Sequence, residues 1–231
     1  MKKYAVIVAG GLGSRMNSAV PKQFLLLQNK PVLYYTLDAF LKAYDDLNII
    51  LVLPEEHVAT GQEIIDAWFD YKRIKITVGG RTRFHSVQNG LQMVEEESMV
   101  LVHDAVRCLL TQSLIHRCYD AALQSGAAIP VVDCKDSVRF VSAHGNEALE
   151  RINVKLVQTP QAFLSTILVP AYNIDYKEKF TDEASVVEAF GMKVHLVEGE
   201  EENIKITHPA DIIYAEQILE TRSIADEQST P

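Results

Sequence analysis

Residues 4–13 read Tyr-Ala-Val-Ile-Val-Ala-Gly-Gly-Leu-Gly, an apolar run that ends in closely spaced glycines. A run without polar interruptions is typical of a strand buried on both faces, as in parallel sheets covered by helices. Glycines directly after such a strand allow a tight turn whose backbone N–H groups face an anion. The start of the chain therefore predicts the first strand of an α/β sheet and a loop suited to phosphate.

Strand-like and helix-like patterns alternate from this stretch as far as residue 132. We predict strands at residues 4–8, 48–53, 74–78, 99–103 and 127–132, and helices at 32–44, 55–69, 84–96 and 111–124. The alternation implies parallel strands joined by right-handed crossovers, and therefore an α/β fold with a doubly wound, mostly parallel sheet. Ligands of such sheets bind beyond the carboxyl ends of the strands. Those ends are predicted at residues 9–13, 54, 79–80 and 103–107.

The pattern changes at residue 133. Residues 133–153 show no helical period, and we predict a protruding β-arm there, although a plain surface hairpin fits the same pattern. The arm is predicted to have strands at 137–141 and 149–152 around a turn at 144–146. Beyond it we predict helices at 165–173, 182–190 and 209–222, short strands at 193–198 and 203–207, and a frayed tail at 223–231. The chain, 1–231, is predicted to be a single domain with the arm as an insertion.

Composition and charge exclude several classes of protein. The 231 residues are 48% hydrophobic and 23% charged, close to the average of globular domains, which excludes a disordered, collagenous or disulfide-rich chain. The 22 Lys and Arg against 31 Asp and Glu give a net charge of −9, which argues against a nucleic-acid or membrane-surface binder. No apolar stretch approaches the ~20 residues of a membrane span. The 3 cysteines have no C-x-x-C spacing, so we expect reduced thiols and a cytoplasmic protein.

The glycine loop after the first strand does not match the common nucleotide motifs. A dinucleotide fingerprint requires a glycine where Met16 stands, and a Walker loop requires a Gly-Lys-Ser/Thr sequence that does not follow. This argues against a nicotinamide-dependent oxidoreductase, the alternative that the fold class suggests. Taken alone, the loop fits a tight turn beside two solvated cations, Arg15 and Lys22, equally well. With Pro21 before the lysine, the spacing resembles the G-G-x-G-x-R-[ML]…P-K pattern of sugar-nucleotide-type nucleotidyltransferases.

Further motifs follow along the chain. They are Pro-Lys-Gln-Phe at 21–24, Gly-Gly at 79–80, Val-His-Asp-Ala-Val-Arg at 102–107, Thr-Pro-Gln at 159–161, Thr-Asp-Glu-Ala-Ser at 181–185 and Asn-Ile-Lys at 203–205. In this order, over about residues 4–219, the sequence resembles the 2-C-methyl-D-erythritol 4-phosphate cytidylyltransferase family, which implies a Rossmann-like nucleotidyltransferase fold. Val106 and Cys108 stand where many members have alanine and proline, and the first loop reads Ala-Gly-Gly rather than Ala-Ala-Gly.

The related ribitol-5-phosphate cytidylyltransferases are the alternative, because they share the first loop and the His-Asp-Ala-Val-Arg motif. Two features favour the erythritol family. The spacing from Arg15 to Lys22 lacks a residue expected of the ribitol branch, and Thr-Asp-Glu-Ala-Ser is the erythritol-type motif.

The resemblance implies transfer of CMP from CTP to a polyol phosphate, with release of pyrophosphate. The attacking phosphate oxygen is already an anion, so the reaction needs positioning and fixed cations more than a strong base. By resemblance, the catalytic residues are Arg15, Lys22, Arg151 and Lys205. The expected CTP-binding residues are Ala9, Gly10, Gly11, Gly13, Gly80, Arg81 and Ser86, and the acceptor-binding residues are Asp104, Arg107 and Thr159.

The resemblance also implies Mg²⁺, held mainly by the triphosphate with Asp104 as a candidate ligand. It implies a homodimer joined through the β-arm, with Arg151 entering the neighbour's active site.

Several of these residues have plainer explanations when each is taken alone. Arg81 and Arg83 fit a solvated helix start, and Asp104 fits a helix cap. Lys205 follows the acidic residues 198–202 and fits a screened surface lysine. We expect a structural role for His103 and no nucleophilic role for Cys108. A nucleotide sensor without catalysis is disfavoured, because a sensor need not keep Arg15, Lys22, Arg151 and Lys205 together.

Overall fold

The apolar run near the start of the chain forms β1 (Lys2–Val8), an interior strand of the main sheet. The computed structural model describes residues 1–11, 20–69, 71–95 and 97–229. β1 pairs in parallel with β4 (Leu47–Leu53) on one side and with β6 (Ser98–Asp104) on the other. Its side chains alternate between two apolar layers, with Ile7 in one and Val6 in the other. Burial on both faces explains why the strand reads as an unbroken apolar run.

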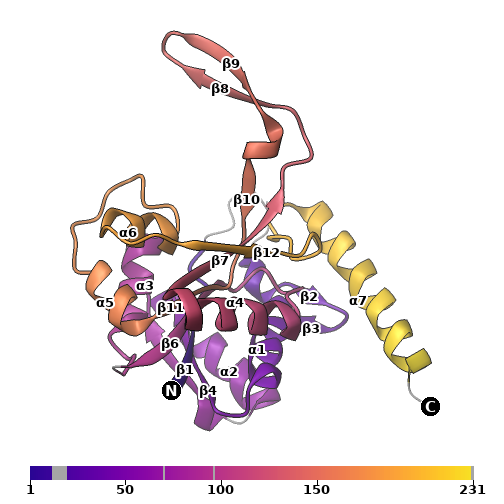
Figure 1. The fold of residues 1–231 in the computed structure, drawn as a ribbon. Helices are drawn as coiled ribbons and strands as arrows, with labels where there is room; N and C mark the ends of the chain where they lie inside the picture. Colours follow the sequence, from indigo (N-terminus) through magenta and orange to yellow (C-terminus); the bar gives the residue numbers. More distant parts are fainter. Residues whose placement is uncertain (12–19, 70, 96, 230–231) are drawn as a thin grey trace.

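The main sheet has eight strands in the order β10-β7-β11-β6-β1-β4-β5, with β12 paired to β7 (Figure 1). The further strands are β5 (Ile74–Val78), β7 (Ala127–Asp133), β10 (Lys155–Val157), β11 (Gln161–Leu164) and β12 (His195–Glu198). β1, β4, β5 and β6 are mutually parallel, and β12 is parallel to β7. β11 runs antiparallel between β6 and β7, and β10 is antiparallel to β7. The predicted mostly parallel, doubly wound sheet is confirmed.

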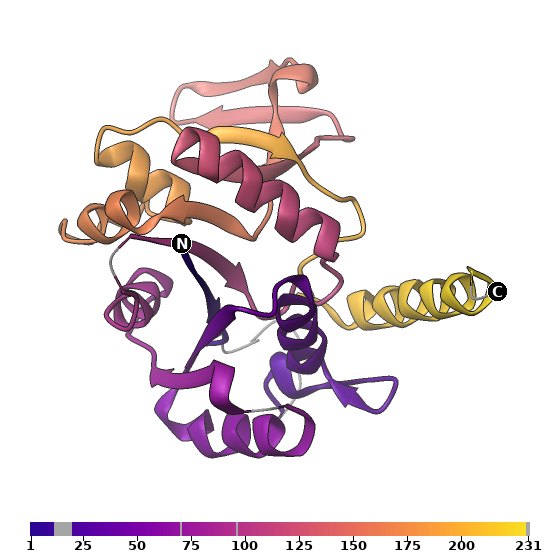
Figure 2. The same ribbon diagram turned by 60° about the horizontal axis from the view of Figure 1, so that its bottom comes forward.

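Helices cover both faces of this sheet (Figures 1 and 2). One layer contains α1 (Val32–Ala43), α2 (Val58–Trp68) and α4 (Gln112–Ser125), and the other contains α3 (Arg83–Leu91), α5 (Ser165–Ala171) and α6 (Glu183–Ala189). A smaller cluster packs α7 (Pro209–Ser229) against the hairpin of β2 (Leu26–Leu27) and β3 (Lys30–Pro31). The far end of α7, yellow in both views, stands away from the body. None of the described helices is long and apolar enough to cross a membrane.

A hairpin of β8 (Val138–Ser142) and β9 (Gly145–Leu149) projects from the body at the top of Figure 1. Among the described strands, these two pair only with each other. The return strand begins at Gly145, four residues before the predicted start, and residues 151–153 form a short 3-10 helix instead of strand. Gly145 has a φ of +128°, a conformation that glycine adopts without strain, so the chain reverses over the two preceding residues alone.

Two predictions for the end of the chain are wrong. Residues 203–207 form no strand, because the N–H of Ile206 pairs with the carbonyl of Val106 away from the sheet. The last helix does not end near Arg222 but continues to Ser229 as part of α7. Residues 223–229 contain neither glycine nor proline, so nothing in that sequence stops a helix already begun.

Candidate active site

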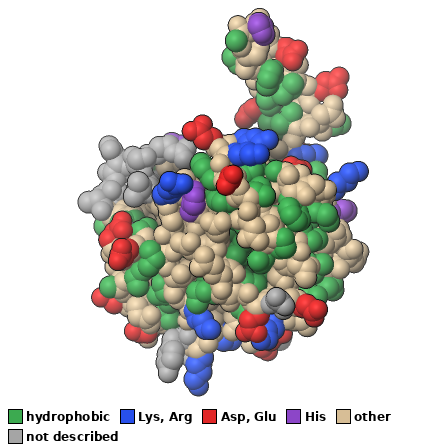
Figure 3. Space-filling view, turned by 90° about the vertical axis from the view of Figure 1, so that its left-hand side faces the viewer, with side chains coloured by type: hydrophobic (Ala, Val, Ile, Leu, Met, Phe, Trp, Pro, Cys, Tyr) green, Lys and Arg blue, Asp and Glu red, His purple; other side chains and the backbone are tan. Residues whose placement is uncertain are grey.

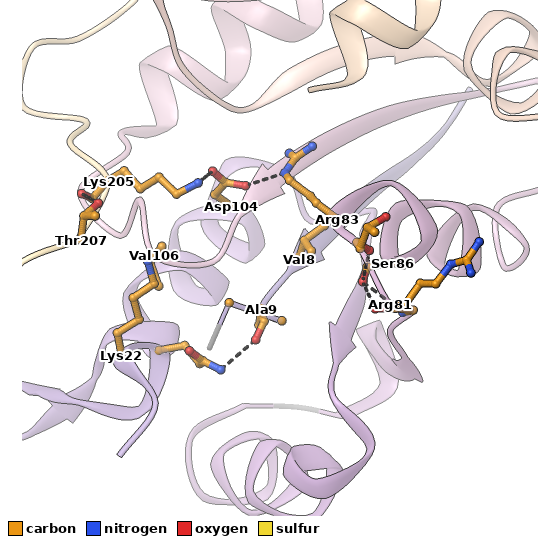
Figure 4. A pocket seen from close by; sticks show the side chains of 15 residues that line it. Val8, Ala9, Lys22, Arg81, Arg83, Ser86, Asp104, Val106, Lys205 and Thr207 are labelled. Atoms are coloured by element: carbon orange, nitrogen blue, oxygen red, sulfur yellow. Dashed lines mark hydrogen bonds and ion pairs between the residues drawn. The ribbon is translucent and has the colours of Figure 1, made fainter. Parts of the chain in front are cut away.

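A cavity of about 440 Å³ lies at the carboxyl ends of β1, β5 and β6 (Figure 4). It is lined by residues 9–11 after β1, residues 80–82 after β5, and Asp104 at the end of β6. Parallel sheets place their ligands at this edge, and the volume lies within the usual range of small-molecule sites. Six of the seven residues expected to bind CTP line this cavity: Ala9, Gly10, Gly11, Gly80, Arg81 and Ser86. The seventh, Gly13, lies outside the described residues.

Lys22 and Gln23 close one side of this cavity from the short 3-10 helix η2 (Lys22–Phe24). Both side chains are buried. The Nζ of Lys22 donates a hydrogen bond to the carbonyl of Ile206 at 2.9 Å, and the Nε2 of Gln23 donates to the carbonyl of Ala9 at 2.8 Å. The ammonium group of Lys22 is therefore held at the cavity wall by backbone from the other end of the chain. Arg15 lies outside the described residues.

The loop between β5 and α3 leaves room for a ligand because its first two residues, Gly79 and Gly80, have no side chains. A Cβ on Gly80 would lie 2.4 Å from the Cβ of His85, far inside normal contact. The N–H of Gly80 donates to the Oγ of Ser86 at 3.1 Å, and the hydroxyl of Thr82 caps the start of α3. Arg81 is exposed, and its guanidinium group points away from Lys22 and Asp104 in Figure 4.

Asp104 sits between two cations. Its Oδ1 accepts a hydrogen bond from the Nε of Arg83 at 3.1 Å, and its Oδ2 forms an ion pair with the Nζ of Lys205 at 2.6 Å (Figure 4). Burial alone would raise the pKa of this carboxyl, but Arg83 and Lys205 outweigh burial and hold the pKa well below its usual range. Asp104 is therefore an anion at any physiological pH.

A second cavity, of about 200 Å³, adjoins the first. Arg83, Asp104 and Lys205 line both cavities, so these three residues form the boundary between them. The second cavity also contains Arg107 and Thr159, two of the residues expected to bind the acceptor, together with Thr181 and Asp182 from the Thr-Asp-Glu-Ala-Ser motif. Two polar cavities that meet at a cluster of cations and a carboxylate are suited to two phosphorylated ligands that must react with each other.

His103 fixes the hydroxyl of Thr159 beside Asp104. Burial lowers the pKa of His103 to about 3, so the ring is neutral. Its Nε2 lies 3.1 Å from the carbonyl of Arg107, which only accepts, so Nε2 carries the proton and Nδ1 is an acceptor. The hydroxyl of Thr159, 3.0 Å from Nδ1, therefore donates to His103 and accepts from the N–H of Asp104. The proton of Thr159 is already used, which favours a positioning role for this residue, in line with the structural role expected for His103.

Two of the expected cations occupy different surroundings. The Nη1 of Arg107 donates to the carbonyl of Asn203 at 2.8 Å, so the guanidinium group is anchored in the wall of the second cavity. Arg151 is exposed at the base of the arm, where its Nη1 donates to the carbonyl of Lys135 at 2.7 Å. Within the described part of the chain, Arg151 lines neither cavity.

The contact between Arg83 and Glu183 was not predicted from the sequence. The Nη1 and Nη2 of Arg83 donate to the two carboxylate oxygens of Glu183 at 2.5 and 3.0 Å. One signal was present in the sequence, because an arginine at a helix start opposes the helix dipole and implies a compensating anion. The identity of that anion could not be found, since the two residues are 100 positions apart.

The described residues offer no protein cage for a metal ion. No group of three or more His, Cys, Asp or Glu side chains among them has metal-binding geometry. Asp104, the candidate ligand, has one cation on each carboxylate oxygen. The donor set therefore does not suit a metal held by protein alone.

Comparison with known proteins identifies the family. The model of the 2-C-methyl-D-erythritol 4-phosphate cytidylyltransferase family matches residues 4–221. The chain belongs to this family. It is 47% identical to the 2-C-methyl-D-erythritol 4-phosphate cytidylyltransferase of Bacteroides thetaiotaomicron and 45% identical to that of Phocaeicola vulgatus, over 95% of this chain and the full length of each relative. A crystal structure of the 4-diphosphocytidyl-2C-methyl-D-erythritol synthase of Anaerococcus prevotii superposes with a TM-score of 0.82 at 30% identity, covering 95% of this chain and 96% of that one.

Membership of the 2-C-methyl-D-erythritol 4-phosphate cytidylyltransferase family confirms the resemblance seen in the sequence. The chain is a CTP-dependent nucleotidyltransferase that serves isoprenoid biosynthesis, and the assignment to the erythritol rather than the ribitol branch is confirmed. The departures at Val106 and Cys108 do not remove it from the family. Both side chains are buried, in the small cluster under α7.

Proposed function

We propose that the larger cavity binds CTP and the smaller one 2-C-methyl-D-erythritol 4-phosphate, so that CMP passes to the acceptor and pyrophosphate leaves. The observation that carries this proposal is the boundary shared by the two cavities, where Arg83, Asp104 and Lys205 line both. Two bound ligands in contact there would bring the acceptor's phosphate against the α-phosphate of CTP. Positioning of this kind supplies much of the rate in phosphoryl-type transfer.

In the proposed reaction, a phosphate oxygen of the acceptor attacks the α-phosphorus, and the bond from that phosphorus to the bridging oxygen of pyrophosphate breaks. The nucleophile needs no base because it is already deprotonated. Lys205 lies at the boundary, where its charge offsets the repulsion between the two phosphates. Lys22, and Arg15 before it, hold the triphosphate and stabilise the charge that develops in the transition state.

We assign the base and the ribose of CTP to the small-residue loops. Residues 9–11 and Gly80 expose backbone to the first cavity, and Ser86 holds the N–H of Gly80 in place. Glycines in these loops allow a ring to approach the backbone closely enough for hydrogen bonds to N–H and carbonyl groups. Asp104, with Arg107 and Thr159 around it, is assigned to the hydroxyl groups and phosphate of the acceptor.

We propose Mg²⁺ as the cofactor, entering with the triphosphate oxygens of CTP rather than on a protein site. The positive charges of Arg83 and Lys205 beside Asp104 disfavour a metal ion on this carboxylate and support this arrangement. Chelation with EDTA is expected to abolish turnover, and added Mg²⁺ to restore it. The proposed location is the cytoplasm, supported by the 3 free cysteines.

We also propose a homodimer in which the arm of each subunit completes the neighbour's active site. The apolar side chains along the arm (Figure 3) and the position of Arg151 at its base, away from both cavities, support this arrangement.

A pyrophosphate-release assay tests the proposed reaction. CTP with 2-C-methyl-D-erythritol 4-phosphate is expected to turn over faster than CTP with ribitol 5-phosphate, and ATP, GTP and UTP are expected to be poorer nucleotides. No pyrophosphate from the erythritol substrate, or faster turnover with ribitol 5-phosphate, would contradict the proposal.

A further inference from the structure

Glu183 is a fully buried carboxylate next to the active site that the proposed chemistry does not use. A buried anion is costly unless cations or hydrogen-bond donors satisfy it. Here the guanidinium group of Arg83 binds both carboxylate oxygens, and the hydroxyl of Tyr172 donates to Oε1 at 3.1 Å. Burial lowers the pKa of Arg83, but Glu183 and Asp104 outweigh burial, so the pKa lies well above its usual value.

The ion pair between Arg83 and Glu183 joins the first residues of two helices. Arg83 is the first residue of α3 and Glu183 is the first residue of α6. Glu183 is favourable at a helix N-terminus, whereas Arg83 is not, so the carboxylate offsets the poor position of the arginine. The start of α6 is itself fixed, because Asp182 caps the helix and the side chain of Gln161 binds both Asp182 and the N–H of Ala184. Arg83 is thus held by a rigid partner.

The contact with Glu183 determines which nitrogen of Arg83 donates a hydrogen bond to Asp104. Glu183 binds one N–H of each Nη atom and so fixes the plane of the guanidinium group, and in this orientation Nε donates to Asp104. A carboxylate oxygen accepts about two hydrogen bonds. With one bond from Arg83 on Oδ1 and one ion pair from Lys205 on Oδ2, each oxygen of Asp104 keeps room for a further donor.

Without the charge of Glu183, the guanidinium group is free to turn. Arginine and carboxylate groups favour two parallel hydrogen bonds. A turned Arg83 would bind both oxygens of Asp104, compete with Lys205 and fill the positions that an acceptor hydroxyl needs.

We infer that Glu183 is a positioning residue which, by binding both Nη atoms of Arg83, fixes the guanidinium group in the orientation that donates from Nε to Asp104 and so keeps Asp104 open to the acceptor's hydroxyl groups. This rests on the proposed function, in which Asp104 binds the acceptor.

The test compares Glu183→Gln with Glu188→Gln, an exposed glutamate on the same helix. For Glu183→Gln we expect kcat/KM for 2-C-methyl-D-erythritol 4-phosphate to fall on the order of 10²-fold, as small misplacements at reacting groups do. The affinity for CTP, measured by calorimetry, is expected to stay unchanged. Glu188→Gln should match the wild type in both. A loss shared equally between the two substrates, or no difference between the two variants, overturns the inference.

A double-mutant cycle separates this role from a merely structural one. If Glu183 acts through Asp104, then adding Glu183→Gln to Asp104→Asn should cost little further activity, whereas an independent structural defect would multiply the two losses. Multiplied losses overturn the inference.

Tyr172→Phe provides a milder variant, because it removes one hydrogen bond to Glu183 and keeps the ring stacked on Phe84. It should show a smaller loss, also confined to the acceptor. If Glu183→Gln does not fold, a wild-type kcat/KM for the acceptor in Tyr172→Phe overturns the inference. Wild-type protein that releases no pyrophosphate overturns the proposed function instead, so the two failures are distinguishable.

Discussion

Lys22 has a proposed catalytic role and a structural contact, and two measurements on one variant distinguish them. For Lys22→Ala we expect kcat to fall by about 10² to 10³, the usual effect of removing one group that stabilises transition-state charge. The substitution also leaves the carbonyl of Ile206 without this donor, which costs about 1–3 kcal/mol of stability. Thermal unfolding and pyrophosphate release at saturating substrate measure the two effects, with the exposed Lys42→Ala as the control. An unchanged kcat, or a loss of activity explained by unfolding, would make Lys22 structural.

His103 predicts a particular dependence of stability on pH. The pKa of His103 is about 3 in the folded protein and about 6.5 in the unfolded chain, so between these pH values only the unfolded chain takes up the proton. This contribution to stability is complete above pH 6.5 and is lost as the pH falls toward 3, by up to ~1.4 kcal/mol per pH unit. In urea titrations from pH 7 to pH 5, His103→Gln should therefore lose stability less steeply than the wild type.

The control for this experiment is His144→Gln, since His144 is exposed in the turn of the arm. It should keep the wild-type slope. Because His103→Gln also removes hydrogen bonds, its absolute stability will be lower, and only the slope tests the prediction. Equal slopes for His103→Gln and the wild type would mean that His103 is protonated in the folded protein.

Among the elements, those that carry an unbroken apolar run were predictable from the sequence. β1, β4, β6 and β7 were placed within two residues, because an apolar run is a signal that needs no knowledge of neighbours. β5, at the edge of the sheet, was placed as well, from its alternating apolar residues before two glycines. β11 was missed, since it is four residues long and begins with a buried glutamine. Gln161 is tolerated there because its amide binds the start of α6, a contact between distant segments. Pairings of this kind cannot be read from local periodicity.

The residues of the candidate site that follow a strand directly were predictable from the sequence, and the contacts between distant segments were not. Loops at the carboxyl ends of strands follow from the sheet, so Ala9, Gly80 and Asp104 were found together. The Arg83–Glu183 pair was not found, because its two residues lie on separate helices and meet only once both helices pack on the same face of the sheet. The described part of a single chain does not explain the expected role of Arg151 either, because its side chain lines neither cavity there.

The loop between β5 and α3 yields a prediction about nucleotide affinity. For Gly80→Ala we expect the KM for CTP to rise about tenfold, equivalent to about 1.4 kcal/mol of binding energy, because the new methyl group collides with His85 and displaces the loop. Gly61→Ala is the control, since a Cβ there also collides, 2.2 Å from the Cδ1 of Leu53, but Gly61 does not line the cavity. Steady-state kinetics with varied CTP measure both. Equal KM values for the two variants would mean that this loop does not shape the CTP site.

At the scale of the whole molecule, the arm is the feature that one chain does not explain. An isolated two-stranded hairpin is marginally stable in water. Three apolar side chains of the arm region, Phe140, Val141 and Ile152, are 53%, 73% and 81% exposed. Exposed apolar surface on a protruding element is typical of an interface, and in a symmetric dimer the same surface meets its own copy. Two clasped arms would cover these side chains and carry each Arg151 toward the other subunit.

Mixing two inactive variants tests this arrangement directly. Lys22→Ala and Arg151→Ala proteins are dissociated, combined in equal amounts and reassociated. If each active site takes Lys22 from one subunit and Arg151 from the other, a mixed dimer contains one site with both defects and one intact site. Random exchange makes half of the dimers mixed, so about a quarter of all sites should regain activity. Subunit exchange is verified with differently tagged chains, and each variant mixed with itself is the control. Exchange without recovered activity would place both residues in the site of a single chain, and a monomer by light scattering would remove the basis for a shared site, because Arg151 would then have no second subunit to reach.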